Sequence, residues 1–517
     1  MSVPRTPNSA AKPGVNPWLV AVVISMATFM EVLDTSIANV ALGHIAGNLG
    51  ASQSQATWVL TSYLAANAII IPISGWLSNT LGRKRFYMTC VALFTVSSFL
   101  CGIAPSLGAL LLCRVLQGAG GGGLAPSEQS MLADTFPGRY FGMAFAVYGI
   151  AVVVAPAIGP TLGGWITDNF SWRWIFFMNV PVGLLSLALT QRLIQDPPAN
   201  PAAPRKPLRV DAMGFGFVVL AFGALQVVLD KGQEADWFGS PFIVAFSALA
   251  VLGFIGLVVW ESWIEKDPVV DLPLLRNGNL ATSMGLQFVV GFILNSTTVL
   301  VPLLAQQLLG YDATQAGLVL MPGGLMLMVM MPVAGTLVRR VQPKYLMASG
   351  LALLTLSLVM MSGFTAQIAF HNLLWARLVQ CLGLPLFFIP LNTIAYGNLP
   401  PGKSNQASAM MNLMRNLGGS IGIAVATTLL VRGAQVHQAY LAAAATRANL
   451  PLVHRLQASG GFTPRSLMGF YNEIQVQATM LSYLDVFRIL TVACVLVIGV
   501  VLLLRRVGKD AQPVLGH

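Results

Sequence analysis

The sequence predicts an all-helical membrane protein with about fourteen membrane-spanning helices. Its 517 residues are 56% hydrophobic and only 9% charged, and the mean hydropathy is +0.72. A composition this apolar is typical of a polytopic membrane protein and excludes an ordinary soluble domain. Runs of roughly 20 apolar residues, the length that crosses a ~30 Å hydrocarbon core, recur along almost the whole chain. Lys and Arg also concentrate in alternate connections between these runs.

The predicted spans follow one another with short connections through most of the chain. They cover residues 17–40, 55–77, 86–103, 107–128, 141–166, 174–194, 212–230, 241–263, 280–304, 314–338, 344–364, 371–394, 405–430 and 485–506. The first span is too long for a secretory signal and contains two acids, so we expect it to remain uncleaved.

The net charge of +11 reflects the orientation of the chain in the membrane and gives no support for a nucleic-acid partner. With both termini in the cytoplasm, the inside segments hold most of the Lys and Arg. The outside segments hold only Arg173, Lys231, Arg432, Arg447, Arg455 and Arg465. This asymmetry follows the positive-inside rule, so we expect a multi-pass protein surrounded by membrane lipids, with both termini cytoplasmic.

The chain contains an internal repeat. "PISGWLSNTLGRKR" from Pro72 is echoed by "PVAGTLVRRVQPKY" from Pro332, and "LLLCRVLQGAG" around Arg114 by "LLWARLVQCLG" around Arg377. The two matches share nearly the same offset and pair span 2 with span 10 and span 4 with span 12. Spans 1 to 6 and 9 to 14 then form related six-helix halves, and spans 7 and 8 are an insertion. Such halves are typical of secondary transporters that rock around a site at the bilayer midplane.

The repeat predicts three units. They are an N-terminal six-helix bundle over 1–195, a linker with two inserted helices over 196–270, and a C-terminal six-helix bundle over 271–517. The linker begins with the proline-rich, basic segment "QDPPANPAAPRKPLRVD" from Gln195. The last unit includes a polar outer loop over 432–484, with a helical stretch "AYLAAAATRANL" and a break at Gly460 and Gly461. A loop this long is uncommon unless it is functional or disordered.

Two acids lie inside the first predicted span, in "FMEVLDTSIANV". Burial disfavours an ionised carboxylate, whereas a nearby Arg favours it, so a buried acid beside an Arg can act as a proton switch. Asp34 and Arg114 are predicted at comparable depth and can pair. Glu31 lies one turn deeper, on nearly the same face as Asp34. The alternatives are a purely structural ion pair for Asp34 and a lone lipid-lining or cavity-lining polar residue for Glu31.

No metal or organic cofactor is expected. The five Cys residues show no CxxC pair or metal-ligand spacing, and the five His residues lie outside the predicted spans or, for His371, at the first residue of one. The second half offers no obvious central acid to pair with Arg377 and Arg415, and the alternative partners are helix C-termini, backbone carbonyls, or Asp34 and Glu31 across the cavity. Its Met and aromatic side chains suit varied apolar cations or amphiphiles, although core packing is the commoner role for such residues. The candidate cavity residues are Met30, Gln117, Phe288, Phe292, Asn295, Met321, Arg377, Phe387, Phe388 and Arg415.

Glycine-rich and basic segments are candidates for conformational change. In "GPTLGGWI", Gly159, Pro160, Gly163 and Gly164 permit close helix contact and a local bend, and a packing interface without a role in transport is the alternative. The run "GAGGGG" follows no strand and lies in an apolar span, so we expect close helix packing there and no phosphate loop.

The loop between spans 2 and 3 is short and basic. Gly82 fits a turn, and Arg83 and Lys84 with Arg85 could bind anionic lipid, lock a gate or merely enforce topology. Asn79 can hydrogen-bond the end of a neighbouring helix, without a charge.

These segments together resemble the major facilitator superfamily, and within it the fourteen-helix drug:proton antiporters of the EmrB and QacA type. "LDTSIANVAL" resembles the first-helix motif, "GWLSNTLGRKR" from Gly75 the superfamily loop motif, "RVLQGAGGG" the helix 4 motif and "GPTLGGWI" the antiporter motif. "WRWIFFMNVPVG", "VLDKGQEADWF" and the long outer loop point to the EmrB branch. The loop motif usually has an acid where this chain has Asn79, so a charge-based latch is not implied.

The resemblance implies a drug antiporter of the bacterial inner membrane. EmrB-type pumps work with a periplasmic adaptor protein and an outer-membrane channel, so it also implies a tripartite complex, with 432–484 as the docking segment. A flexible loop that shields the exit is the alternative for that segment.

We therefore predict a proton-coupled exporter of amphipathic toxic compounds that works by alternating access, with the proton gradient as its energy source and no enzymatic activity. One alternative is a carrier of a single physiological solute, such as a fatty acid or siderophore. Another is a membrane scaffold or receptor that transports nothing.

Overall fold

A computed structural model describes residues 12, 14–136, 138–195, 211–264, 270–311, 313–338, 340–397, 399, 403–445, 454, 457 and 463–503. Thirteen helices in this part of the chain are long and apolar enough to cross a membrane, or up to 14 when the bent pair Tyr140–Pro156 and Ile158–Asn169 is counted as one span. The predicted fold class, an all-helical membrane protein with about fourteen spans, is confirmed.

The first six spans form one bundle. Its elements are α1 (Pro17–Leu49), α2 (Gln53–Ala56), α3 (Trp58–Leu81), α4 (Arg83–Ile103), α5 (Leu107–Gly121), α6 (Leu124–Thr135), α7 (Gly138–Asn169), α8 (Trp174–Phe177) and α9 (Asn179–Leu193). α5 with α6, and α8 with α9, each make one span. α1 packs on α7 and α9, and α5 packs on α3 and α4.

The inserted spans lie beside α3. They comprise α10 (Ala212–Val218), η1 (Val219–Gly223), α11 (Ala224–Lys231), η2 (Trp237–Gly239), α12 (Pro241–Val259) and η3 (Trp260–Ile264). η1 and α11 pack against α3, and α11 also touches α17. The predicted linker lies from residue 196 to residue 210 outside the described residues, so the unit boundaries at 195 and 270 stay predictions.

The last six spans form the second bundle. Its elements are η4 (Leu272–Arg276), α13 (Gly278–Leu309), α14 (Ala313–Leu337), α15 (Pro343–Ser362), α16 (Phe370–Gly397), α17 (Ser404–Ala444) and α19 (Pro464–Leu503). α13 packs along α17, and α15 lies between α16 and α19. The two bundles meet where α7 packs on α14 and α3 packs on α17.

Local sequence explains where these helices begin, end and approach closely. Asn16 caps α1 by accepting a hydrogen bond from the Trp18 N–H, Pro17 occupies the first helical position, and Gly50 ends the helix with φ +61°. The "GAGGGG" run packs α5 against its neighbours, as predicted: a Cβ at Gly120 would lie 2.7 Å from the Phe94 amide nitrogen of α4.

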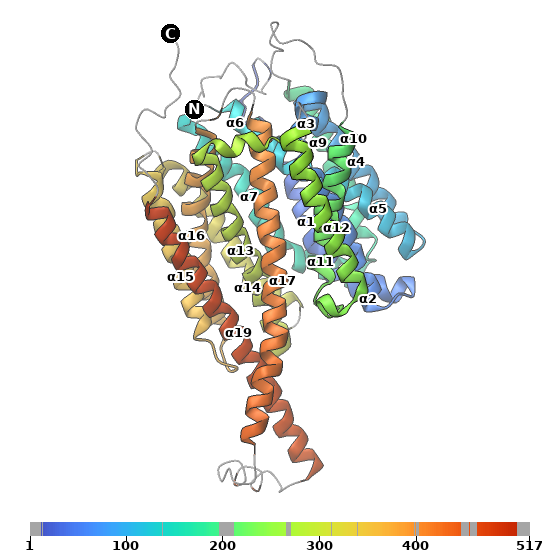
Figure 1. Cartoon of the computed structure of the whole chain (residues 1–517), viewed down its shortest axis with the longest axis vertical. Coiled ribbons are helices and arrows are strands. Elements are labelled where there is room, and N and C mark those ends of the chain that lie inside the picture. Colours follow the sequence, from blue (N-terminus) through green and yellow to red (C-terminus); the bar gives the residue numbers. More distant parts are fainter. Residues whose placement is uncertain are drawn as a thin grey trace.

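The predicted outer loop is largely helical. α17 continues to Ala444 and α19 begins at Pro464, and the two helices project together beyond the bundles in the lower part of Figure 1. The loop prediction is therefore wrong over 432–438 and 464–484, whereas the predicted helical stretch is confirmed over 439–444. An Ala-rich segment without Pro lets α17 continue once the apolar stretch ends, and hydropathy detects only the apolar part. Ser482 Oγ donates a 2.7 Å hydrogen bond to the Leu430 carbonyl and ties the helices together. The break predicted at Gly460 and Gly461 lies outside the described residues.

We call the end of the molecule where α1 begins the terminus side, and the opposite end, where α17 and α19 extend, the projection side (Figure 1).

Candidate functional site

A cavity of about 640 Å³ lies between the two bundles. On one side it is lined by residues of α1, α3, α6, α7 and α11, and on the other by residues of α13, α14, α16 and α17. Its polar lining includes Glu31, Asn67, Gln129, Gln226, Asp230, Glu234, Asn295, Arg377, Asn412 and Arg415. Most of the remaining lining is apolar or aromatic, which is typical of a site for small amphipathic molecules.

The two bundles are in contact on the terminus side. A Cβ at Gly75 of α3 would lie 2.8 Å from the Gln406 Cα of α17. Asn405 Nδ2 donates a 2.5 Å hydrogen bond to Asn79 Oδ1, and Gln129 accepts one from Asn412 at 2.8 Å. On the projection side, Asp230 and Glu234 at the end of the first inserted span, together with Thr427 of α17, line the cavity. This conformation is therefore closed on the terminus side.

Asp34 lies at the centre of a buried polar network inside the first bundle. Its Oδ2 is 2.6 Å from Arg114 Nη1, and its Oδ1 accepts hydrogen bonds from Gln117 Nε2 at 3.0 Å and Asn179 Nδ2 at 2.7 Å. Arg114 Nε also donates to the Val59 carbonyl at 3.1 Å. The expected contact between Asp34 and Arg114 is present, and the role of the pair in proton coupling stays a prediction. Neither Asp34 nor Arg114 lines the cavity.

Glu31 faces the cavity. Its Oε1 accepts hydrogen bonds from Asn67 Nδ2 at 3.0 Å and Tyr63 Oη at 3.3 Å, both from α3. A three-residue step along a helix rotates the side chain by ~60° from the starting face. That rotation turns Asp34 toward α5 and α9, so the expectation of one shared face is wrong for Glu31 and Asp34. Tyr63 joins the two sites, because its ring also lies 4.4 Å from the Arg114 guanidinium carbon.

The second bundle contributes two Arg side chains to the cavity wall. Arg377 Nη1 donates to Gln380 Oε1 at 2.5 Å and Nη2 donates to Thr298 Oγ1 at 3.3 Å. Within the part of the chain that the structure describes, neither Arg377 nor Arg415 forms an ion pair with a carboxylate. Both residues were expected to lack an acidic partner within the second half, and the alternative of a direct ion pair with Asp34 or Glu31 across the cavity is not observed among the described residues.

Four of the predicted cavity residues line the cavity: Asn295, Arg377, Phe388 and Arg415. For the other six the prediction is wrong, since none is among the described lining residues: Met30, Gln117, Phe288, Phe292, Met321 and Phe387. Met30 and Phe387 are fully buried in the bundle cores, and Met321 is 40% exposed on the outside. The Gln117 side chain donates a hydrogen bond to Asp34 inside the first bundle. The helical period separates these side chains from the cavity face, and the rotation of each helix is decided by packing.

The glycine motif of α7 packs on α1. A Cβ at Gly163 would lie 2.8 Å from Ile37 Cγ2, and Gly159 lies against Ser36 in the same way. Gly164 has no described atom within 4 Å of such a Cβ, so the prediction of close helix contact is wrong for this residue. Pro160 lies within α7, the helix whose two segments are bent by 40°. The gating role of the motif stays a prediction.

The basic loop is anchored to its own bundle. Gly82 has φ +89°, which fits the predicted turn between α3 and α4. Arg83 forms an ion pair with Asp134 of α6, and Lys84 Nζ donates a 3.1 Å hydrogen bond to the Gln191 carbonyl. Asn79 bonds the first turn of α17, as expected for an uncharged residue at a helix end.

The acids missed by the sequence analysis include Glu128 and Asp230, besides Glu234 of the cavity lining. Glu128 is 0% exposed, and Asp230 lines the cavity and accepts a hydrogen bond from Thr61. Both are the last residues of predicted spans, where an acid is easily taken as part of a connection. Their position inside an apolar run was the available signal.

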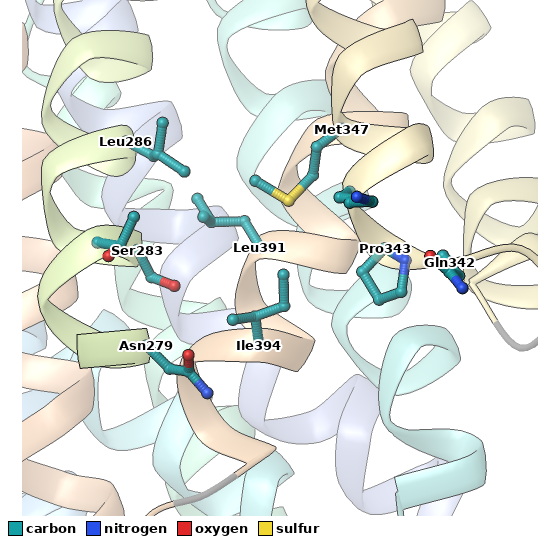
Figure 2. A pocket seen from close by; sticks show the side chains of 10 residues that line it. Asn279, Ser283, Leu286, Gln342, Pro343, Met347, Leu391 and Ile394 are labelled. Atoms are coloured by element: carbon teal, nitrogen blue, oxygen red, sulfur yellow. The ribbon is translucent and has the colours of Figure 1, made fainter. Parts of the chain in front are cut away.

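A second cavity, of about 60 Å³, lies between α13, α15 and α16. Asn279 and Ser283 come from α13 and Met347 from α15 in Figure 2. Its described lining contains no acid, and it is too small for a drug-sized molecule. The described residues also contain no group of three or more His, Cys, Asp or Glu that could hold a metal ion.

Two six-helix bundles around a central, largely apolar cavity with a few polar groups define a secondary membrane transporter. The chain belongs to the major facilitator superfamily, since residues 24–423 match the family model described as Major Facilitator Superfamily. This confirms the resemblance seen in the motifs.

Relatives of known name support the same branch. The chain is 40% identical over 424 residues to the multidrug export protein EmrB of Haemophilus influenzae, covering 82% of each chain. It is 37% identical to EmrB of Escherichia coli K12, again over 82% of each chain. It is also 37% identical to the fatty acid resistance protein FarB of Neisseria gonorrhoeae, over 80% of this chain and 81% of that one.

Solved structures share the fold. The human organic anion transporter MFSD10 superposes with a TM-score of 0.60 at 13% identity, over 92% of this chain and 98% of that one. The proton:xylose symporter XylE gives a TM-score of 0.57 at 14% identity, over 92% and 95%. At this level of identity the likeness concerns the fold alone.

Proposed function

We propose that the protein is a proton-coupled exporter of amphipathic toxic compounds that works by alternating access. The observation that carries this proposal is the position of Glu31, a carboxylate in the wall of a cavity between two bundles, linked through Tyr63 to the buried pair of Asp34 and Arg114. Multidrug export proteins among the relatives support the choice of substrate.

Antiport follows from competition for the same carboxylates. A carboxylate in a cavity can hold a proton or attract a cationic substrate, and holding both at once is unfavourable. Binding of a proton to Glu31 therefore favours release of a cation, and the reverse holds on the other side of the membrane. Asp34 lies behind the cavity wall, and a change in the charge of Glu31 affects it through Tyr63 and Arg114. The proton gradient then supplies the energy, with no cofactor.

Alternating access requires the terminus side to open. In this proposal the units 1–195 and 271–517 rock about the α7 and α14 contact, and 196–270 moves with the first unit because η1 and α11 pack on α3. Gly75 and Asn79 lie at the contact that must part, and Arg83 is joined to it through Asp134, which accepts a hydrogen bond from Ser404 of α17. Gly82 and Lys84 lie in the adjoining turn. The terminus side faces the cytoplasm of a bacterium, and the chain resides in the inner membrane.

A second candidate substrate class is the amphipathic anion. Arg377 and Arg415 line the cavity without a direct ion pair in the described chain, although Arg415 interacts electrostatically with Glu31, and a guanidinium favours carboxylate or phosphate. One relative is a fatty acid resistance protein. In this proposal the cavity binds cations beside Glu31 and anions beside Arg377 and Arg415.

The projecting ends of α17 and α19 are the proposed docking point for a periplasmic adaptor protein, which in turn connects to an outer-membrane channel. Tyr440 is 73% exposed and Met468 is 60% exposed on these ends. Exposed aromatic and Met side chains of this kind are common in protein interfaces.

Substrate-dependent proton flux in proteoliposomes tests the function. Antiport gives opposite fluxes of ethidium and protons. Parallel fluxes would identify a symporter and thus an uptake carrier, and the absence of any coupled flux would identify a scaffold or receptor. Parallel movement or no movement overturns the proposal.

A further inference from the structure

Glu128 is a buried carboxylate that plays no part in the mechanism above. It lies in α6 and is 0% exposed. Its Oε1 accepts a 3.0 Å hydrogen bond from the backbone N–H of Thr28 in α1. Thr28 lines the cavity one turn before Glu31, so Glu128 lies directly behind the cavity wall.

No positive charge neutralises Glu128. Its Oε2 is buried without a hydrogen-bond partner, and in the described part of the chain no Lys, Arg or His forms an ion pair with it. An ionised carboxylate without a partner is costly in an apolar interior, so a proton on Glu128 is favoured in this conformation.

The neighbouring helices do not change this balance. The ionisable groups that interact with Glu128 from the neighbouring helices are Glu31 of α1, Tyr87 of α4 and Tyr148 of α7. The cations on these helices are engaged elsewhere, since Arg83 of α4 pairs with Asp134. Arg114 is held by Asp34, and Arg415 lines the cavity. Tyr87 Oη donates its hydrogen bond to the Ile24 carbonyl of α1 at 3.0 Å. Glu31 is the acid that interacts with Glu128, and like charges disfavour ionisation of both.

The same short helix forms part of the closed contact on the terminus side. Gln129, the next residue, accepts a 2.8 Å hydrogen bond from Asn412 of α17. Further along α6, Ser130 bonds Asn405, and Asp134 accepts a 3.2 Å hydrogen bond from Ser404 Oγ. Opening of the terminus side therefore has to separate α6 from α17 beside Glu128, and water gains access to this region when it does.

We propose that Glu128 holds a second exchangeable proton of the transport cycle. The carboxyl is protonated while the terminus side is closed, and it releases the proton to water on the terminus side when α6 separates from α17. Thr28, with its hydroxyl buried beside Glu128 and its side chain in the cavity wall, connects the carboxyl to the cavity. This inference rests on the proposed proton-coupled export.

Proton release on substrate binding tests the inference. Ethidium is added to the purified full chain in weakly buffered detergent solution, and released protons are measured with a pH indicator at several pH values. We expect Glu128→Gln to release about one proton fewer per protein molecule than the unmodified protein, because the amide cannot titrate. Glu128→Asp should retain the release. Asp168→Asn, at an acid that is 67% exposed, is the matched control and should behave like the unmodified protein.

The outcomes separate this inference from the proposed function. Absence of proton release from the unmodified protein overturns proton coupling itself. If Glu128→Gln releases as many protons as the unmodified protein, only the proposal of a second exchangeable proton is overturned. If Glu128→Gln fails to bind ethidium, the test uses Glu128→Asp instead. A shift in the pH dependence of proton release by Glu128→Asp supports the inference, and an unchanged pH dependence rejects it.

Discussion

The ring of Tyr63 lies against the guanidinium of Arg114, with 4.4 Å between the guanidinium carbon and the ring centroid. The hydroxyl of the same Tyr63 donates to Glu31 at 3.3 Å. One side chain of α3 therefore touches the cavity carboxylate and the cation that holds Asp34.

The ring and the hydroxyl of Tyr63 can be tested separately. Tyr63→Phe keeps the ring on Arg114 and removes one hydrogen bond, so we expect a loss of about 0.5–1.5 kcal/mol in stability. Tyr63→Leu also removes the cation–π contact, which adds about 2 kcal/mol for a desolvated pair, and should impair export more strongly. Thermal unfolding and ethidium efflux in proteoliposomes measure the two effects. Equal behaviour of both variants would show that the ring does not matter.

Asp34→Asn should abolish proton-driven export while ethidium still binds. The amide cannot release a proton, and it leaves Arg114 buried without a counter-charge, which costs about 3–5 kcal/mol of stability. The double variant Asp34→Asn with Arg114→Gln should recover part of that stability without recovering export. Full active efflux by Asp34→Asn would contradict the coupling role.

Arg415→Gln should weaken binding of amphipathic carboxylates more than binding of ethidium. Loss of a charge-assisted hydrogen bond costs about 1.5–3 kcal/mol, or roughly 10- to 100-fold in Kd. Binding of a fluorescent fatty acid and of ethidium to the purified protein compares the two classes. A similar loss for both ligands would argue against a separate anion wall.

Gly75→Ala should keep the terminus side from closing fully. Its Cβ would lie 2.8 Å from the Gln406 Cα, closer than such atoms approach in proteins. In a background without native Cys, the thiol of Ser408→Cys, at a position that is 0% exposed, should then react faster with a polar maleimide. Gly47→Ala, where the added Cβ has no described atom within 4 Å, is the control. Unchanged labelling in Gly75→Ala would remove Gly75 from the gate.

Replacement of residues 436–478 by a Gly/Ser linker should preserve transport in proteoliposomes, where no adaptor is present. The contact between Ser482 and Leu430 lies outside the replaced segment, so the bundles should remain joined. Drug resistance in cells and co-purification with the adaptor should both be lost. Retention of resistance together with adaptor binding would show that docking takes place elsewhere.

The fold class, the approximate number of spans, the two acids of the first helix and the family could all be predicted from the amino-acid sequence. These properties are local, since the transfer of each apolar run into a bilayer depends on that run alone. The repeat around Arg114 and Arg377 predicted two related halves in the same way. Motifs at Gly82 and Gly163 could be interpreted because a turn or a close contact has a local signature.

The set of side chains that face the cavity depends on tertiary packing. Glu31 lines the cavity and Asp34 does not, because packing on α7 and α9 sets the rotation of α1, and no local pattern contains that angle. Glu128 was recognisable as an acid in an apolar run, but its lack of a partner depends on the helices around it. The continuation of α17 to Ala444 was hidden for a related reason. Hydropathy reports contact with lipid, whereas the end of a helix depends on backbone conformation and on the helix packed beside it.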